Sequence, residues 1–371
     1  IVNNAEGNPF YAEELIKILI EEGIILKTES KWRVHPERIG EVHIPASLTG
    51  VIQARLDRLA PQDKIVIQQA SVIGRTFWDD SVSYVYGNAD IELGNATVAK
   101  SLRTLQEREL VFPRPHSRFA GTVERNFRHA LLRDVAYETV LKRLRREYHS
   151  LAADWLIENS GDRIGESAGL PAGTAGLIAD HLAQSGRELE AVHYLVQAAR
   201  LAVTSSANQE AIDYLLNALR LLDNQPGTAE LIEQKLDLLA QLGRLYFAVK
   251  GFGSSEALQT FERAQILMAN GGNPRQHFAV LHGLYGSAIG NAEWENALTY
   301  GDQLLQMAQA SGRVTLQMWA HYSLGSANFW SGYLIHSREH QNILLELYDP
   351  EKHGRQFRRV IEDPRLSALN Y

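Results

Sequence analysis

The chain has 371 residues, of which 45% are hydrophobic and 22% charged, a balance that suits folded domains and excludes wholesale disorder. The absence of cysteine excludes disulfides, thiolate metal sites and cysteine nucleophiles and suits a reducing compartment, so we expect a cytoplasmic protein. No run approaches the roughly 18 apolar residues of a membrane span, and the length allows two or three domains.

The net charge of −7 is unevenly distributed. Between residues 99 and 150, twelve Lys and Arg residues stand against six Asp and Glu residues, a local net charge of +6. Such a block is typical of a local site for phosphate or an acidic partner, and equally of a solvated helix face. The sequence leaves both interpretations open.

The first predicted element is a helix that Asn8 and Pro9 begin and Gly23 ends. Asn is a good N-cap, Pro suits the first helical turn, where a missing N–H costs nothing, and Gly favours the helix C-terminus. Apolar runs at 24–26 and 32–34 flank a polar turn, which predicts a β-hairpin.

Residues 45–160 predict a winged-helix domain. The pattern gives helices over 47–59, 62–73 and 88–109, then strands over 110–113 and 124–127. Three helices followed by a two-stranded wing is the winged-helix arrangement. His129 then lies where the wing runs into the next helix.

Two features of this domain suggest other chemistry. GNATVAKS at 94–101 differs from the phosphate-binding loop GxxxxGK[ST] by Ala99, but it follows no apolar strand and continues a helical period, so we expect a helix there. Basic residues on the predicted third helix are interrupted by Glu107 and Glu109, which favours domain packing over DNA binding. No histidine–carboxylate spacing typical of a metal site stands out.

The region 170–371 predicts helices only. A small residue, a bulky one four later and a small one three after that, the signature of tetratricopeptide helices, occurs three times: Ala191/Leu195/Ala198, Ala211/Leu215/Ala218 and Ala257/Phe261/Ala264. Gly243, Gly283 and Gly325 recur at offsets of 40 and then 42 residues, longer than the roughly 34 of a strict repeat. We therefore expect a truncated α-solenoid of degenerate tetratricopeptide-like repeats that binds a protein partner.

Gly7-Asn8-Pro9 resembles the GxP motif of signal-transducing STAND ATPases and related AAA-type ATPases. In that family the motif follows the nucleotide-binding core, and its proline packs on the adenine. The resemblance implies that Pro9 contacts ATP or ADP. The alternative interpretation is a simple helix start.

The segment 126–137, NFRHALLRDVAY, resembles the MHD-type motif that closes the STAND winged helix. The family's Met-His-Asp reads Arg128-His129-Ala130 here, and the following Leu-x-Arg-Asp-x-Ala is present. The resemblance implies that His129 reaches the nucleotide phosphates and that Arg128 adds a phosphate contact. The alternative for His129 is a half-buried capping residue.

Residues 6–158 as a whole are similar to large bacterial proteins in which a class III nucleotide cyclase domain precedes an AAA/STAND ATPase and tetratricopeptide repeats. The run at 44–59, IPASLTGVIQARLDRL, carries most of this resemblance. It implies a mainly α chain in three parts: 1–44, the C-terminal end of the ATPase module with its lid helix; 45–160, the winged helix; and 170–371, the repeats. It also implies ATP or ADP as cofactor, with Mg held by residues upstream of this fragment.

We therefore expect the regulatory fragment of a bacterial adenylate cyclase, with no catalytic residue of its own, controlled by a STAND switch. Its partners would be the upstream ATPase core and output domain in cis and a protein on the repeats, with no membrane or nucleic acid. One alternative is a STAND-type transcription regulator of the LuxR kind, which carries the same module. A second is a non-enzymatic repeat scaffold.

Overall fold

The computed structural model of the chain describes residues 9–27, 32–36, 38, 47–88, 91–161, 172–357 and 365. Within them the protein is mainly α, with seventeen helices and two small sheets. Two compact units emerge, residues 1–170 with 177–191 (unit 1) and residues 171–176 with 192–371 (unit 2). None of the helices in the described part combines the length and apolar character that crossing a membrane requires.

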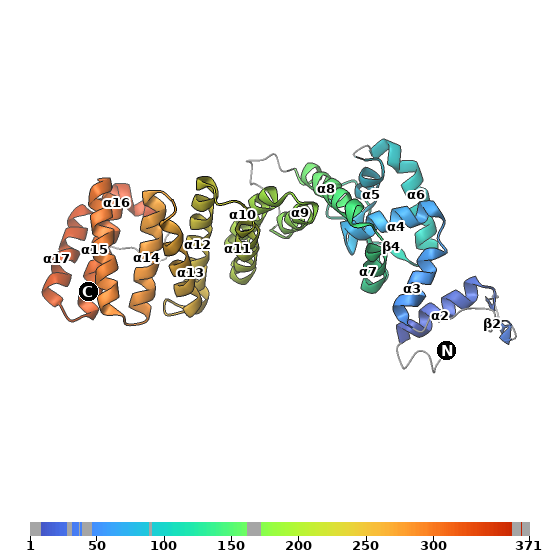
Figure 1. Cartoon of the computed structure of the whole chain (residues 1–371), viewed down its shortest axis with the longest axis horizontal. Helices are drawn as coiled ribbons and strands as arrows, with labels where there is room; N and C mark the ends of the chain where they lie inside the picture. The colour runs from blue at the N-terminus through green and yellow to red at the C-terminus, as the bar shows by residue number, and fades with distance from the viewer. Residues whose placement is uncertain are drawn as a thin grey trace. The chain divides into compact units, whose positions relative to one another are not determined.

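Unit 1 begins with a helix and a hairpin and continues into helices around a second sheet (Figure 1). Its elements are α2 (Pro9–Glu21), β1 (Ile25–Lys27), β2 (Trp32–Val34), α3 (Leu48–Asp57), α4 (Pro61–Ile73), β3 (Thr76–Trp78), α5 (Asp79–Tyr86), α6 (Ile91–Glu107), β4 (Val111–Pro113), β5 (Glu124–Phe127), α7 (Ala130–Glu138) and α8 (Lys142–Asn159). The predicted cap Asn8 lies outside the described residues. Gly23 follows α2 with φ 65°, a left-handed conformation that favours glycine.

The winged helix contains two elements that the sequence pattern did not predict. Its sheet has three antiparallel strands in the order β3-β5-β4, and α5 follows β3 directly. Only β4 and β5, the two strands of the wing, were predicted. The signal missed was local: Asp79 and Asp80 lie in the first turn of α5, where carboxylates favour the helix dipole, and the Ser81 hydroxyl accepts from the Trp78 N–H.

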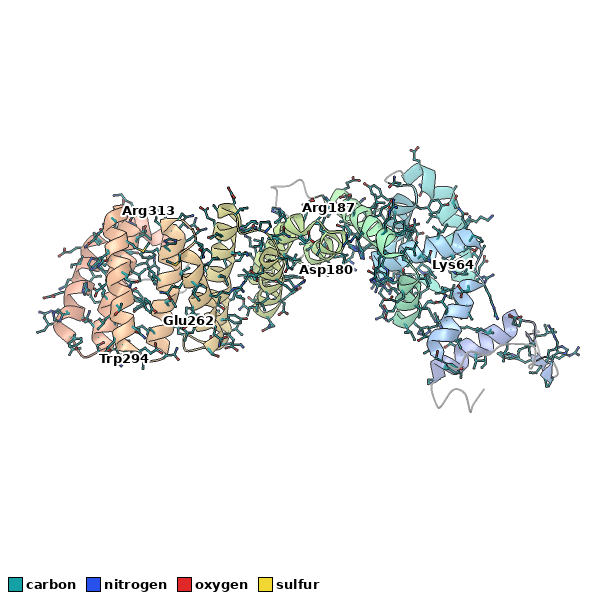
Figure 2. All side chains as sticks on the ribbon, viewed as in Figure 1. Lys64, Asp180, Arg187, Glu262, Trp294 and Arg313 are labelled. Carbon is teal, nitrogen blue, oxygen red and sulfur yellow. The ribbon has the colours of Figure 1, made fainter. Side chains whose placement is uncertain are left out.

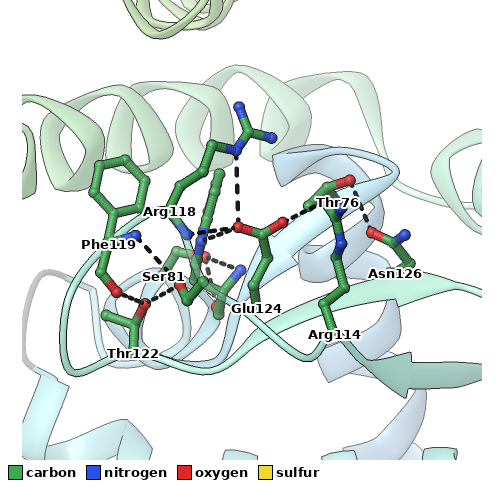
Figure 3. Close-up of polar contacts among 10 residues, drawn as sticks. Thr76, Ser81, Arg114, Arg118, Phe119, Thr122, Glu124 and Asn126 are labelled. Atoms are coloured by element: carbon green, nitrogen blue, oxygen red, sulfur yellow. Dashed lines mark hydrogen bonds and ion pairs between the residues drawn. The ribbon is translucent and has the colours of Figure 1, made fainter. Parts of the chain in front are cut away.

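The wing loop between β4 and β5 is anchored on a buried carboxylate, Glu124, which is 1% exposed (Figure 3). It accepts hydrogen bonds from the Trp78 indole N–H at 3.2 Å, the Arg118 backbone N–H at 3.0 Å and the Arg114 guanidinium at 2.6 Å. Buried charges require such pairing. The loop is thereby held against β3, and Arg114 and Arg118 both pair with a carboxylate of their own domain.

The near-match to a phosphate-binding loop at 94–101 lies inside α6, as predicted. A Cβ at Gly94 would overlap the backbone of Ser83 in α5. The glycine therefore allows two helices to approach closely, and it cradles no phosphate.

Two histidines face each other in the interior of unit 1. His149 in α8 and His181 in α9 (Ala172–Ser185) place their Nδ1 atoms 2.8 Å apart, and the Tyr137 hydroxyl lies 3.1 Å from His149 Nε2. Burial lowers the pKa of both rings, and the cations Arg133 and Arg145 lower that of His149 further. Both imidazoles are therefore neutral at physiological pH.

This pair predicts a loss of stability in acid. A histidine whose pKa is lower in the folded than in the unfolded chain stabilises the fold fully above about pH 6.5 and progressively less below it. We expect the loss to reach roughly 2 kcal/mol at pH 5 for each ring that stays neutral. Urea unfolding of the wild type and His181→Leu at pH 8 and pH 5 measures it. Wild type should lose more stability than the variant, and equal losses would contradict the prediction.

Unit 2 is built from antiparallel helices that stand side by side from α12 to α17 (Figure 1). The helices that follow α9 are α10 (Glu188–Thr204), which crosses from unit 1 into unit 2, α11 (Asn208–Asp223), α12 (Ala229–Lys250), α13 (Ser255–Met268), α14 (Pro274–Gly290), α15 (Trp294–Ser311), α16 (Val314–Trp330), α17 (Leu334–Leu347) and α18 (Pro350–Phe357). The predicted repeat architecture is confirmed by these stacked pairs.

The small–bulky–small triads mark packed faces. All nine residues are at most 3% exposed. Two of the triads fall on the consecutive helices α10 and α11, so the signature does not single out the second helix of a pair there. In the third triad the Phe261 ring of α13 fills space left by Gly243 in α12 and Gly283 in α14, where a Cβ would overlap it. The glycine spacing therefore encodes the close approach of three helices to one ring.

Candidate functional site

The two sequence motifs lead to a group of charged residues in unit 1. Pro9 is the exposed first residue of α2, while Gly7 and Asn8 lie outside the described residues. Arg128 and His129 connect β5 to α7, and His129 is the N-cap residue of α7. They approach α2 one turn beyond Pro9, where its acidic residues lie. We name this group the charge cluster: Glu13, Glu14, Lys17, Arg55, Glu109, Arg128 and His129.

The centre of the charge cluster is a buried ion pair between Glu14 of α2 and Arg55 of α3, each 3% exposed at its side chain. The second Arg55 Nη group donates to the Arg108 carbonyl oxygen at 2.8 Å. Arg55 thus connects α2 to the end of α6. Because Glu14 is almost fully buried, it depends on this partner for compensation of its charge.

Lys17 joins three carboxylates of the charge cluster. Its Nζ lies 2.7 Å from Glu13, 3.3 Å from Glu14 and 3.0 Å from Glu109. The hydrogen bond from Lys17 lowers the pKa of both Glu13 and Glu109. Burial opposes the charge of Lys17, but its bonds to Glu13 and Glu109 outweigh burial and raise its pKa. Glu13, Glu109 and Lys17 are therefore ionised at neutral pH.

His129 and Arg128 border the charge cluster from the winged-helix side. The ligand atoms of Glu13, Glu14 and His129 lie within 4.8 Å of one another, and Arg128 Nη2 is 4.0 Å from Glu13. Burial lowers the pKa of His129, although Glu14 and Glu13 act in the opposite direction, so the ring is neutral at pH 7. The structure thus brings His129 and Arg128 together against the helix that Pro9 begins.

Glu13, Glu14 and His129 have the donor atoms of a metal site. Lys17 and Arg55, however, already pair with the two carboxylates. A divalent ion would have to displace the Lys17 ammonium, so the geometry favours an ion-pair network between helices.

Half of the basic residues in the block at 99–150 form ion pairs inside unit 1. Six of its twelve basic residues lie within 4.0 Å of a carboxylate: Arg114, Arg118, Arg125, Arg128, Arg133 and Arg145. Of these, Arg128 has the longest ion pair and a side chain that is 47% exposed. It is the basic residue of the charge cluster best placed to meet a further anion.

Comparison with known proteins gives similarities to solved structures. The sequence matches no protein-family model and no curated protein. The structure is similar to that of a STAND protein with a tetratricopeptide repeat sensor from Pyrococcus horikoshii, with 14% identity, TM-score 0.32 and 99% of this chain covered. It is also similar to the apo form of the quorum sensor NprR from B. thuringiensis, with 10% identity, TM-score 0.23, and 94% of this chain and 99% of that chain covered. The chain spans 60% of the length of the first protein, and both TM-scores are too low to support an assignment of function.

Proposed function

We propose that this chain is the regulatory part of a signal-transducing ATPase of the STAND type, in which the charge cluster holds α2 against the winged helix in the resting state. The observation that carries this proposal is the buried Glu14–Arg55 pair. It fastens the helix that follows the GxP motif to the domain that presents Arg128 and His129.

A contact of this kind suits a switch. A buried ion pair contributes little net stability, yet separating the partners while one stays buried is costly. Helix α2 is therefore expected to be either docked or undocked, with few intermediate positions. A ligand shifts such an equilibrium only through different affinities for the two states.

Pro9, Arg128 and His129 are proposed to contact ATP or ADP. Arg128 fits a phosphate because it is half exposed and its pair with Glu13 is long. His129 fits as a neutral hydrogen-bond donor, and Lys17 and Arg55 offset the negative charge of the two carboxylates beside it. The phosphate of a bound nucleotide would compete with the Glu13 carboxylate for Arg128 and His129.

The proposed output is adenylate cyclase activity, supported by the resemblance of 44–59. The assay is cAMP formation from ATP by the intact gene product. A DNA-binding domain in its place would make the protein a regulator of the LuxR kind, with the same charge cluster. The repeats are proposed to bind the protein partner whose arrival releases α2.

His129→Ala tests the nucleotide contact. We expect ADP binding to the intact gene product to weaken about tenfold, the value of one hydrogen bond to a charged group, and basal output to rise. Isothermal titration calorimetry gives the ADP affinity. The matched control is His116→Ala in the exposed wing loop, which should change neither quantity. Unchanged ADP affinity and output in His129→Ala would refute the nucleotide contact.

A further inference from the structure

Unit 2 carries a groove lined by aromatic rings from five consecutive helices. Its volume is about 700 Å³, in the range of ligand sites. The rings come from α12, α13, α14, α15 and α16 and include Phe247, Phe278, Tyr285, Trp294, Trp319 and Trp330. We name it the aromatic groove. Within one repeat each ring resembles an ordinary core residue, and only the stacking of repeats joins the rings into one surface.

The aromatic groove continues into a basic hollow of about 450 Å³. Arg244, Arg275 and Ala279 line both, so the two cavities adjoin, and Arg200 and Asp237 line the hollow alone. Among the described residues, no carboxylate lies within 4.0 Å of the Arg244 or Arg275 guanidinium. Burial, which removes the guanidinium from water, lowers the pKa of Arg244; the charge of Asp237 raises it and that of Arg275 lowers it. Two neighbouring cations thus lack a close counter-ion at one end of an apolar surface.

The openness of the aromatic groove distinguishes between classes of occupant. Two of its lining residues remain substantially exposed, Phe252 at 46% and Trp330 at 50%, and an exposed apolar run at 333–335 begins three residues after Trp330. An acyl chain gains most from a pocket that encloses it on all sides. A peptide can place apolar side chains into an open groove while its polar backbone stays in water. The open edge therefore favours a peptide.

We propose that the aromatic groove binds an acidic, apolar segment of a partner protein, with apolar side chains over Phe278 and Trp319 and a carboxylate at Arg244 and Arg275. This inference names the chemistry of the partner that the proposed function places on the repeats. Arg–carboxylate pairing supplies orientation, and desolvated aromatic contacts supply most of the affinity. Because the two arginines lie at one end of the aromatic groove, they fix the direction in which the partner segment binds.

The test is selection of random dodecapeptides displayed on phage against the immobilised 371-residue chain. We expect enriched peptides to combine apolar residues with Asp or Glu. Arg244→Met and Arg275→Met should each weaken the best synthetic peptide at least tenfold in fluorescence anisotropy. A peptide with Asn and Gln in place of the acids should bind weakly to wild type and variants alike.

Arg313→Met is the matched control, because Arg313 is exposed and follows the end of α15 opposite Trp294 (Figure 2). It should leave peptide affinity unchanged, and circular dichroism confirms that each variant is folded. No enrichment, enriched peptides without acidic residues, or retained affinity in both arginine variants would overturn the proposal. Arginine-dependent binding of decanoate without peptide binding would instead assign the groove to a carboxylate lipid. None of these outcomes affects ADP binding at His129, so failure here is distinguishable from failure of the proposed function.

Discussion

Replacing Arg55 by Met is expected to lower the free energy that holds α2 on unit 1 by about 3 kcal/mol, the cost of leaving one member of a buried ion pair without its partner. Glu14 would stay buried with Lys17, at 3.3 Å, as its remaining cation. The loss of the Arg55 bond to the Arg108 carbonyl adds to the cost. Hydrogen exchange of the α2 amides, read by mass spectrometry, measures the effect.

A second ion pair, between the residues that directly follow α3 and α2, provides the control. Arg58 pairs with Glu22 at 2.7 Å, but both side chains are about one-third exposed. Arg58→Met should therefore cost less than about 1 kcal/mol. In the double variant Arg55→Met/Glu14→Gln, the buried charge is gone, so its cost should be smaller than the sum of the single changes. Equal exchange in Arg55→Met and Arg58→Met would show that the buried pair does not hold α2.

Gly283→Ala is expected to destabilise unit 2 by about 1–3 kcal/mol through overpacking. The added methyl group would overlap the Phe261 ring, which is fully buried and already fills the space beside Gly243. Helix propensity alone predicts the opposite sign, a gain of up to about 1 kcal/mol. Urea unfolding followed by circular dichroism decides which effect wins.

Gly173→Ala in α9 is the matched control, because an added Cβ there meets no atom within 4 Å. It should be neutral or stabilising. Phe261→Leu should recover part of the stability when combined with Gly283→Ala, because the smaller side chain frees the space that the methyl group needs. A Gly283→Ala variant as stable as Gly173→Ala would mean that the three helices can move apart at no cost.

The repeat region was the most predictable part of the chain, for a physical reason. Close packing of helices on one aromatic ring requires small residues at fixed separations, and the sequence carries them at Gly243 and Gly283, which lie against the Phe261 ring. Elements β3 and α5 escaped prediction because neither is long enough to show a periodic pattern.

The candidate site was predictable only in its motif residues. The pattern pointed to Pro9, Arg128 and His129, but not to the side chains they approach. Glu14 and Arg55 are 41 residues apart, and each lies in an ordinary amphipathic helix, so no local spacing in the sequence indicates that they pair. The aromatic groove could not be predicted from the sequence for a similar reason, since it forms only when helices of several repeats are stacked.

Hydrogen exchange of α2 in the intact gene product, compared between saturating ADP and a non-hydrolysable ATP analogue, tests the switch most directly. If ADP keeps α2 docked, its amides are protected from exchange with ADP bound. If the ATP analogue releases α2, the same amides exchange at least about tenfold faster, a shift of about 1.4 kcal/mol in the docking equilibrium. Equal protection of α2 with both nucleotides would contradict the proposal that this helix transmits the nucleotide state.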